Sequence, residues 1–366
     1  MRLAAECFRD GAEMPNVVHV VPGLDETGNG ISVAARFMAS EQSAKICEAR
    51  TFDESKLAGI DEVWVHSMWT PMVLRSCRIA LKSGKRLVRM IHANLDPVRL
   101  EYHAWKKRLV GPIERRYLRR SDRIIATCEA ERGWIETYLG KRCPQIEVID
   151  LKRFFNICRK ERKAGVEYFN AEEQRRGGAE SVDVGCVGHV ERGGVHLLYL
   201  GRRHPLKGLE YLEAALGKCK NVKMWKRENV GNANDGEVGI AFRIESSVFG
   251  EEKERVWEWC DVLVLPTLSE NFGLVVAEAL ERGKYVLTTD GAPAWNPELE
   301  TCRVEEAISK SKVLSPKSNN AEILKGYGDR LFYLKGYRDG SREMRVSLLR
   351  EGLKEIACLF QRGKMV

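Results

Sequence analysis

The sequence predicts an α/β protein in which two Rossmann-like, doubly wound domains face each other across a cleft. Two observations lead to this prediction. Short, nearly continuous apolar runs alternate with helical patterns along both halves of the chain, as in parallel sheets that are covered by helices on both faces. The length of 366 residues also suits two domains better than one.

The expected elements fall into two series. In the first half we expect strands over 17–21, 62–66, 87–92, 123–127 and 146–149, and helices over 31–40, 73–82, from about 97 onward, and over 129–138. In the second half we expect strands over 197–200, 222–225, 239–242, 262–265 and 285–289, and helices over 209–217, 252–260 and 273–281. A last helical pattern spans 341–362.

Residues 156–184 mark the expected boundary between the domains. They mix basic and acidic side chains and hold few apolar residues that could anchor a core. We therefore predict a first domain over 1–155, a linker or insertion over 156–184 and a second domain over 185–340. We expect the last helix, within 341–366, to cross back to the first domain.

The composition excludes several classes of protein. Hydrophobic residues make up 44% and charged residues 31% of the chain, which is typical of a globular protein and not of a disordered one. No apolar run approaches the ~18–20 residues of a membrane-spanning helix, and the first 15 residues lack the apolar core of a secretory signal. The 11 cysteines are scattered without a metal-binding spacing, so we expect reduced thiols and a cytoplasmic protein.

The stretch from Val262 to Gly283 carries the strongest local signal. A buried apolar run ends at Pro266, a short loop with Glu270 follows, and a helical pattern begins near Gly273. The first N–H groups of a helix have no internal acceptor and carry partial positive charge, so this junction suits a phosphorylated ligand. It also lies at the carboxyl end of a parallel strand, where ligands of open α/β sheets bind.

Two glutamates, Glu270 and Glu278, lie about two helical turns apart at this junction. The segment resembles the Glu-x7-Glu motif of the retaining GT-B glycosyltransferases of family 4; a helix with two incidental glutamates is the alternative. The resemblance implies that Glu270 contacts the donor sugar and that Glu278 binds the ribose of the nucleotide. It also implies that the donor site is lined by Asn271, Phe272, Gly273 and Leu274.

A second segment, Gly201-Arg202 to Lys207-Gly208, resembles the Gly-Arg-x4-Lys-Gly turn of the same family. The resemblance implies that Arg202 and Lys207 neutralise the diphosphate of the donor. Fixed cations there stabilise the charge that builds on a leaving nucleoside diphosphate. We therefore expect an enzyme that needs no metal ion and no other cofactor. A basic surface turn is the alternative.

Two features of the first half complete the expected cleft. The loop of Gly28, Asn29 and Gly30 after the first strand resembles the glycine loop that faces the cleft in the family; an ordinary turn is the alternative, and no dinucleotide-binding G-x-G-x-x-G is present. His92 ends an apolar strand, where the family has a histidine that faces donor sugar and acceptor. A structural histidine is the alternative there, and we expect the other six histidines to be structural.

The segment 105–120 is rich in lysine and arginine. We expect Gly111 and Pro112 to break it into two helices. The surrounding region resembles the N-terminal domain of bacterial lipopolysaccharide and polysaccharide members of the family, which favours contact with an anionic membrane surface. A solvated basic face is the alternative. Nucleic acid is not an expected partner, because no nucleic-acid-binding module accompanies the charge.

The resemblance implies a retaining hexosyltransferase that moves a sugar from a nucleotide-sugar donor on the second domain to a glycan or lipid-linked acceptor on the first. Cell-envelope polysaccharide or lipopolysaccharide synthesis at the inner membrane face is the expected setting. The charged linker and the absence of a glycine-rich strand end over 225–231 depart from the family. Two alternatives therefore stay open: a non-catalytic scaffold of the same fold in a glycan assembly complex, and a nucleotide-sugar epimerase or other cofactor-dependent enzyme.

Overall fold

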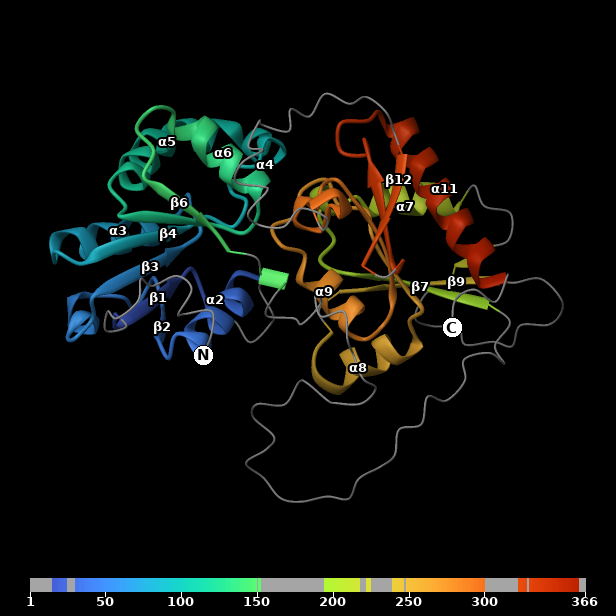
Figure 1. Ribbon diagram of the computed structural model, residues 1–366, viewed down its shortest axis with the longest axis horizontal. Helices are drawn as coiled ribbons and strands as arrows, with labels where there is room; N and C mark the ends of the chain where they lie inside the picture. The colour runs from blue at the N-terminus through green and yellow to red at the C-terminus, as the bar shows by residue number, and fades with distance from the viewer. Residues whose placement is uncertain are drawn as a thin grey trace, which may run out of the picture.

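The computed structural model describes residues 15–24, 30–149, 151–152, 194–217, 222–224, 239–246, 248–299, 322–327 and 329–361. These residues form two α/β domains that lie side by side, each around its own sheet (Figure 1). The fold class predicted from the sequence is thus confirmed. The expected linker, 156–184, lies outside the described residues, so the domain boundaries stay a prediction.

The first domain has a six-stranded sheet in the order β2-β1-β3-β4-β5-β6. Its strands are β1 (Val17–Val21), β2 (Lys45–Glu48), β3 (Glu62–His66), β4 (Arg86–Met90), β5 (Arg123–Ala126) and β6 (Gln145–Val148). Its helices are α2 (Gly30–Glu41), η1 (Glu54–Leu57), α3 (Pro71–Lys82), α4 (Pro97–Glu101), α5 (Ala104–Arg119) and α6 (Glu129–Leu139). All neighbouring strands are parallel, so they end at one edge of the sheet.

The second domain has a seven-stranded sheet in the order β12-β13-β11-β10-β7-β9-β8. Its strands are β7 (Gly194–Leu200), β8 (Val222–Met224), β9 (Gly239–Glu245), β10 (Val262–Leu265), β11 (Tyr285–Thr289), β12 (Glu322–Gly326) and β13 (Leu331–Lys335). Its helices are η5 (Pro205–Lys207), α7 (Leu209–Leu216), α8 (Gly250–Trp259), α9 (Leu274–Glu281), η6 (Pro293–Trp295), η7 (Pro297–Leu299) and α11 (Arg342–Gln361). Only β12 runs antiparallel within the described strands.

Burial explains why the central strands were easy to predict. Every residue of β1, β3 and β10 is buried, because helices cover both faces of a parallel sheet and leave no polar side to the strand. The expected bounds of these three strands are therefore confirmed. The strands β2 and β12, which lie at sheet edges, and β13 beside β12 were not predicted.

The last helix corrects one expectation. We expected it to cross back to the first domain, but α11 packs on α7 and β13 of the second domain. Its buried face, with Leu349 and Leu353, joins the cluster that contains Leu212 and Phe332. Figure 1 shows α11 on the flank of the second domain that faces away from the first. The apolar face of this helix is satisfied within its own domain.

The basic helix corrects a second expectation. We predicted a break at Gly111 and Pro112, but α5 runs through Pro112 without interruption. The chain turns earlier, at His103, which adopts a left-handed conformation (φ 56°) between α4 and α5. The hydrogen bond that Pro112 forfeits is offset by packing on α6, where the Tyr138 hydroxyl donates to the Gly111 carbonyl at 3.0 Å.

Candidate functional site

The carboxyl end of β10 meets the carboxyl ends of β4 and β5 across the two domains. Asn271, in the loop between β10 and α9, places its amide nitrogen 3.0 Å from His92 Nδ1. Its amide oxygen lies 3.0 Å from the Thr127 hydroxyl. Ligands of open α/β sheets bind at this edge, and we call these contacts the inter-domain seam.

Asp96 is the centre of a second set of contacts in the seam. It is buried, accepts a hydrogen bond from the Ser269 hydroxyl at 2.7 Å and pairs with Arg338. Arg99 Nε donates to the same Ser269 oxygen at 2.8 Å. These bonds link α4 of the first domain with the β10–α9 loop and the segment after β13. They fix the loop that carries Glu270.

Lys207 and Glu270, both predicted from the sequence, form an ion pair. Lys207 ends η5 after β7, and its side chain is 18% exposed against 13% for Glu270. Burial raises the pKa of Glu270, but the Lys207 ammonium and the Arg99 guanidinium outweigh it, so the pKa lies below its usual range. Glu270 is therefore an ionised acceptor with a cation beside it, just before α9.

Two glycines make this geometry accessible to the chain. Gly273 caps the start of α9 with φ +73°, a left-handed conformation that L-residues rarely adopt. Gly208 has φ +64°, and a Cβ there would lie 1.9 Å from the Pro266 carbonyl oxygen. Glycine at Gly208 thus lets the turn after Lys207 press against the end of β10, which brings Lys207 to Glu270.

Glu278 lies on α9 and pairs with Lys253 of α8. The Lys253 ammonium is 2.7 Å from one carboxylate oxygen and 2.8 Å from the other. Both side chains remain partly exposed. Glu278 therefore has a cation partner as Glu270 does, and a ribose hydroxyl would have to share or replace Lys253.

The remaining residues of the β10–α9 loop have different surroundings. Phe272 is buried, and its ring lies 5.1 Å from that of Trp295 in η6, whose indole N–H donates to the Phe272 carbonyl. Its side chain thus anchors the loop within the second domain.

Arg202 is exposed, and its carbonyl accepts a hydrogen bond from the Tyr199 hydroxyl at 2.9 Å. Its guanidinium is open to solvent beside η5.

The glycine loop reaches the second domain at Gly30. A methyl group on Gly30 would lie 3.7 Å from Leu274 Cδ1, so the start of α2 is in near contact with the start of α9. Gly28 and Asn29 lie outside the described residues, and their part in the cleft stays a prediction.

Three buried histidines form a row behind the seam, and two of them, His19 and His66, were not expected from the sequence to lie at the site. His19 Nδ1 lies 2.9 Å from His66 Nε2, and His66 Nδ1 lies 2.8 Å from His92 Nε2. Adjacent rings stack with centroids 5.1 Å apart. Gln42 Oε1, 2.8 Å from His19 Nε2, ends the row on one side, and Asn271 ends it on the other.

Strand register explains how the row forms. His19 pairs across β1 and β3 with Trp64, two residues before His66. His66 pairs across β3 and β4 with Met90, two residues before His92. Side chains two residues apart share one face of a strand. The three histidines therefore lie on one face of the sheet, each two residues further along its strand than the one before. His66 ends β3 and His92 follows the end of β4, but His19 lies in the middle of β1, so position along the strands gave no common signal.

Burial keeps these imidazoles neutral. It lowers the pKa of His19 to about 4, against a smaller opposite effect of the Gln42 hydrogen bond, and it lowers the pKa of His66 well below its usual value. Burial and the Arg99 guanidinium lower the pKa of His92 to about 3. His92 lies where the sequence placed it, but its ring is 1% exposed and both nitrogens are bonded. Its catalytic role stays a proposal.

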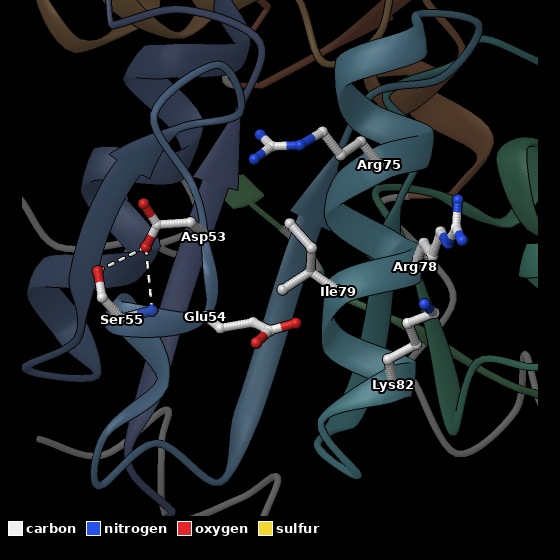
Figure 2. Close-up of a pocket in the computed structure, with 7 residues that line it drawn as sticks. All are labelled: Asp53, Glu54, Ser55, Arg75, Arg78, Ile79 and Lys82. Carbon is white, nitrogen blue, oxygen red and sulfur yellow. Dashed lines mark hydrogen bonds between the residues drawn. The ribbon is translucent and has the colours of Figure 1, made fainter.

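A pocket of about 530 Å³ opens elsewhere, between η1 and α3 (Figure 2). It is lined by Asp53, Glu54, Ser55, Arg75, Arg78, Ile79 and Lys82. Asp53 accepts hydrogen bonds from the backbone and hydroxyl of Ser55, at 3.0 and 2.5 Å, and thereby caps η1. The basic side chains of α3 are exposed, and the pocket shares no residue with the seam. We assign it no chemistry.

Two family models match the chain, one in each domain. Residues 5–151 match a family described as a glycosyl transferase 4-like domain, and residues 194–313 match glycosyl transferases group 1. The first match contains the whole first sheet, the second contains β7 to β11 of the second sheet, and together they cover more than half of the chain. A search among curated proteins found no match.

Several solved structures are similar in fold. They include a sucrose-phosphate synthase from Thermosynechococcus elongatus (13% identity, 75% of this chain and 81% of that one, TM-score 0.48). A trehalose-6-phosphate synthase (12%, 96% and 99%, 0.46) and a lipopolysaccharide outer core galactosyltransferase (12%, 75% and 80%, 0.41) are others. At these scores they add no argument about function. On the two family matches, this chain belongs to the group 1 glycosyltransferases of the GT-B fold.

Proposed function

We propose that this protein transfers a hexosyl unit from a nucleotide sugar to a glycan or lipid-linked acceptor, with retention of anomeric configuration. We also propose that it needs no metal ion and works in the synthesis of cell-envelope polysaccharide or lipopolysaccharide. Family membership supplies the transferase activity and the nucleotide-sugar donor. The observation that supports the donor site and metal independence is the Lys207–Glu270 ion pair beside the first turn of α9.

The ion pair supplies both partners that a donor needs. The Lys207 ammonium and the first N–H groups of α9 form a positive site for the diphosphate. When Lys207 turns to phosphate, Glu270 is left as an ionised acceptor for a sugar hydroxyl. Arg202, exposed beside η5, supplies a second cation. Charge on the leaving nucleoside diphosphate is then stabilised by the protein alone, which supports metal independence.

We propose a front-face reaction for the chemical step. The bond from the anomeric carbon to the diphosphate oxygen breaks, and the acceptor hydroxyl bonds to that carbon from the same side. Its proton passes to the departing phosphate, so nucleoside diphosphate is the other product. The donor is held on the second domain and the acceptor on the first. The contacts of the seam close the two domains over the reacting atoms and exclude water.

Thermal unfolding against a panel of nucleoside diphosphates and nucleotide sugars tests the donor site. A ligand that binds the folded state raises the melting temperature by mass action, so we expect one nucleotide and its sugar conjugates to stabilise the protein. The double variant Lys207→Ala/Glu278→Ala should lose the shift, while Arg203→Ala, an exposed neighbour that pairs with Glu213 at 3.7 Å, should keep it. A shift that the double variant retains would rule out this site.

The same panel separates the alternatives. A non-catalytic scaffold would show no consumption of any donor, with or without acceptor extracts. An epimerase would convert one nucleotide sugar into another without releasing nucleoside diphosphate. The proposed transferase alone releases nucleoside diphosphate as sugar appears on an acceptor.

We further propose that α5 holds the protein on an anionic membrane surface. Three apolar side chains four residues apart, Trp105, Leu109 and Ile113, are 62%, 70% and 50% exposed, so they form one stripe along the helix. The helix cannot rotate them inward, because Glu114 on its opposite face is buried, pairs with Arg89 at 3.3 Å and accepts from the Trp69 N–H at 2.5 Å.

The charge and composition of this segment indicate that the stripe contacts an anionic lipid surface. Residues 105–120 carry seven lysines and arginines and one glutamate, and that glutamate is the buried Glu114. An exposed apolar stripe flanked by cations fits the boundary between headgroups and acyl chains of an anionic bilayer. No described helix is long and apolar enough to span a membrane. We propose a cytoplasmic, peripheral location on the strength of the stripe and its charge.

Co-sedimentation with phosphatidylcholine vesicles, with and without phosphatidylglycerol, tests the membrane proposal. We expect binding to the anionic vesicles only, and a loss of roughly tenfold or more in the Trp105→Ala/Leu109→Ala variant as apolar burial is removed. Phe249→Ala removes a comparably exposed aromatic side chain (42%) from the second domain and should bind as the wild type does. Equal binding by all three proteins would refute the surface.

A further inference from the structure

The histidine row has a direction. Each neutral imidazole has one N–H and one lone pair, so a ring that accepts from one neighbour must donate to the other. At one end the Gln42 carbonyl oxygen faces His19 Nε2, and at the other the Asn271 amide nitrogen faces His92 Nδ1. Both ends require the same order, in which His19, His66 and His92 all carry their hydrogen on Nε2.

The Thr127 hydroxyl extends this order to a buried acid. With its NH2 group on His92, Asn271 presents its oxygen to Thr127 Oγ1 at 3.0 Å. The same Oγ1 lies 2.7 Å from Glu131 Oε2. One hydroxyl hydrogen cannot serve two acceptors. If it serves Asn271, the short contact to Glu131 needs a hydrogen from Glu131 itself.

We propose that Glu131 is a protonated positioning residue whose hydrogen sets the direction of the whole chain from Thr127 through Asn271 to Gln42. Glu131 then donates to Thr127, Thr127 to Asn271, Asn271 to His92, and each histidine to the next. The device holds Asn271, the neighbour of Glu270, in one orientation against the first domain. Its use in catalysis rests on the proposed function, but the hydrogen-bond order does not.

Burial favours the neutral form of Glu131, whereas its hydrogen bonds favour the ionised form. Its carboxyl group is fully buried and accepts from the backbone N–H groups of Ala93 and Thr127. The Arg99 guanidinium and the buried Cys128 thiol are the other titratable groups that act on it or are acted on by it. Burial raises the pKa of Glu131 above its usual value, although these hydrogen bonds and Arg99 oppose the rise.

Ionisation of Glu131 would reverse the chain. The Thr127 hydroxyl would turn to the carboxylate, and the Asn271 oxygen would lose its donor. The amide would then have to rotate and accept from His92, which moves the hydrogen of every ring to Nδ1.

A metal site is the other common use of three histidines, but their nitrogens bond to one another in line and do not converge, and the described residues contain no group able to hold a metal ion.

Nuclear magnetic resonance of the full-length protein tests the proposal without any substrate. Histidine labelled with nitrogen-15 shows which ring nitrogen bears the hydrogen, and glutamate labelled at the carboxyl carbon shows whether Glu131 is protonated. Single His→Asn variants and Glu131→Gln assign the signals. At pH 7 we expect Nε2–H in His19, His66 and His92, and a protonated Glu131. Hydrogen on Nδ1 in any of the three rings, or an ionised Glu131, would overturn the proposal.

Two substitutions at Thr127 test the link itself. Thr127→Ser keeps the hydroxyl and should keep the wild-type spectrum. Thr127→Val keeps the shape but removes the hydroxyl that contacts both Glu131 and Asn271, so the three rings should show mixed tautomers. A fully ordered Nε2–H row in Thr127→Val would show that Glu131 does not direct it. Because no nucleotide sugar is used, failure here leaves the proposed transferase untouched, and failure of the donor tests leaves this result standing.

Discussion

The two halves of the inter-domain seam, one from each domain, consist of chemically different groups. The second domain contributes ion pairs that remain partly exposed, Lys207 with Glu270 and Lys253 with Glu278. The first contributes neutral imidazoles at 0–1% exposure, joined in a row. Partly exposed charges can exchange one partner for a ligand. A buried neutral row cannot, because each lost hydrogen bond leaves a polar atom without a partner.

This difference assigns the two halves different tasks. In the proposed function the charged half binds and releases the donor: diphosphate would replace Glu270 on Lys207, and a hydroxyl would replace Lys207 on Glu270. The neutral half keeps its shape and presents Asn271 at a fixed place. Substitutions in the two halves should therefore change different quantities. Substitutions of the charged residues should change activity and donor affinity, and substitutions of the histidines should change the pH dependence of stability.

The largest effect is expected from Lys207→Met. It removes the cation that we propose for the leaving diphosphate and leaves Glu270 without its partner, so kcat/KM for donor consumption should fall roughly thousandfold. Steady-state kinetics measure it. Arg203→Met is the matched control, since this neighbouring side chain is 63% exposed and should change kcat/KM less than about twofold. Equal losses in the two variants would remove the distinction between site and surface charge.

A smaller effect is expected on stability from the histidine row. The folded pKa of His19 lies at about 4, below the value of ~6.5 in an unfolded chain. The unfolded state therefore binds more protons between these values, and the free energy of unfolding falls as pH drops through that window. Between pH 7 and 5 the loss due to His19 is about 2 kcal/mol.

Urea unfolding at pH 7 and 5 measures this loss. His19→Asn removes one titrating ring, so the variant should lose about 2 kcal/mol less than the wild type over the same interval. His103→Asn is the control: His103 is exposed and left-handed, a conformation that asparagine tolerates, and its pH dependence should match the wild type. If His19→Asn has the wild-type slope, the ring is not buried as a neutral group.

The smallest effect is expected from Glu278→Gln. The amide keeps the shape but loses the charge that we assign to a ribose hydroxyl, so the KM for the donor should rise about tenfold while kcat changes little. Glu254→Gln removes an exposed carboxylate that pairs with Arg282 at 2.7 Å and should leave both constants unchanged. A fall in kcat at constant KM would place Glu278 nearer the reacting atoms than the ribose.

The charged half of the seam could be predicted from the sequence, but the histidine row of the neutral half could not. The reason is physical. The charged half is formed by two local turns, which contain Lys207, Gly208, Glu270 and Gly273. Within a local turn the glycines and charged residues are close in sequence, so their spacing can be recognised from the sequence. The row of His19, His66 and His92 depends on the register of three strands, which separations along the chain do not encode. The same holds for Asp96, Ser269 and Arg338, whose contacts join segments more than 170 positions apart.

The misplaced last helix has a related cause. Its apolar spacing correctly predicted a helix, but spacing alone does not say which surface buries it. Leu349 and Leu353 pack on the second domain. Similarly, a break into two helices at Gly111 and Pro112 is predicted because proline forfeits a backbone bond, whereas contacts from α6 and the buried Glu114 hold α5 together. In both cases tertiary packing decided where local preference left a choice.

The central claim is that the seam cleaves the bond between a sugar and a nucleoside diphosphate without a metal ion. The most direct measurement is the release of nucleoside diphosphate from the nucleotide sugar that stabilises the protein, with membrane extract as acceptor and with EDTA present. We predict steady release by the wild type and none by Glu270→Ala. No release by the wild type with any stabilising donor, or release that EDTA abolishes, would contradict the account.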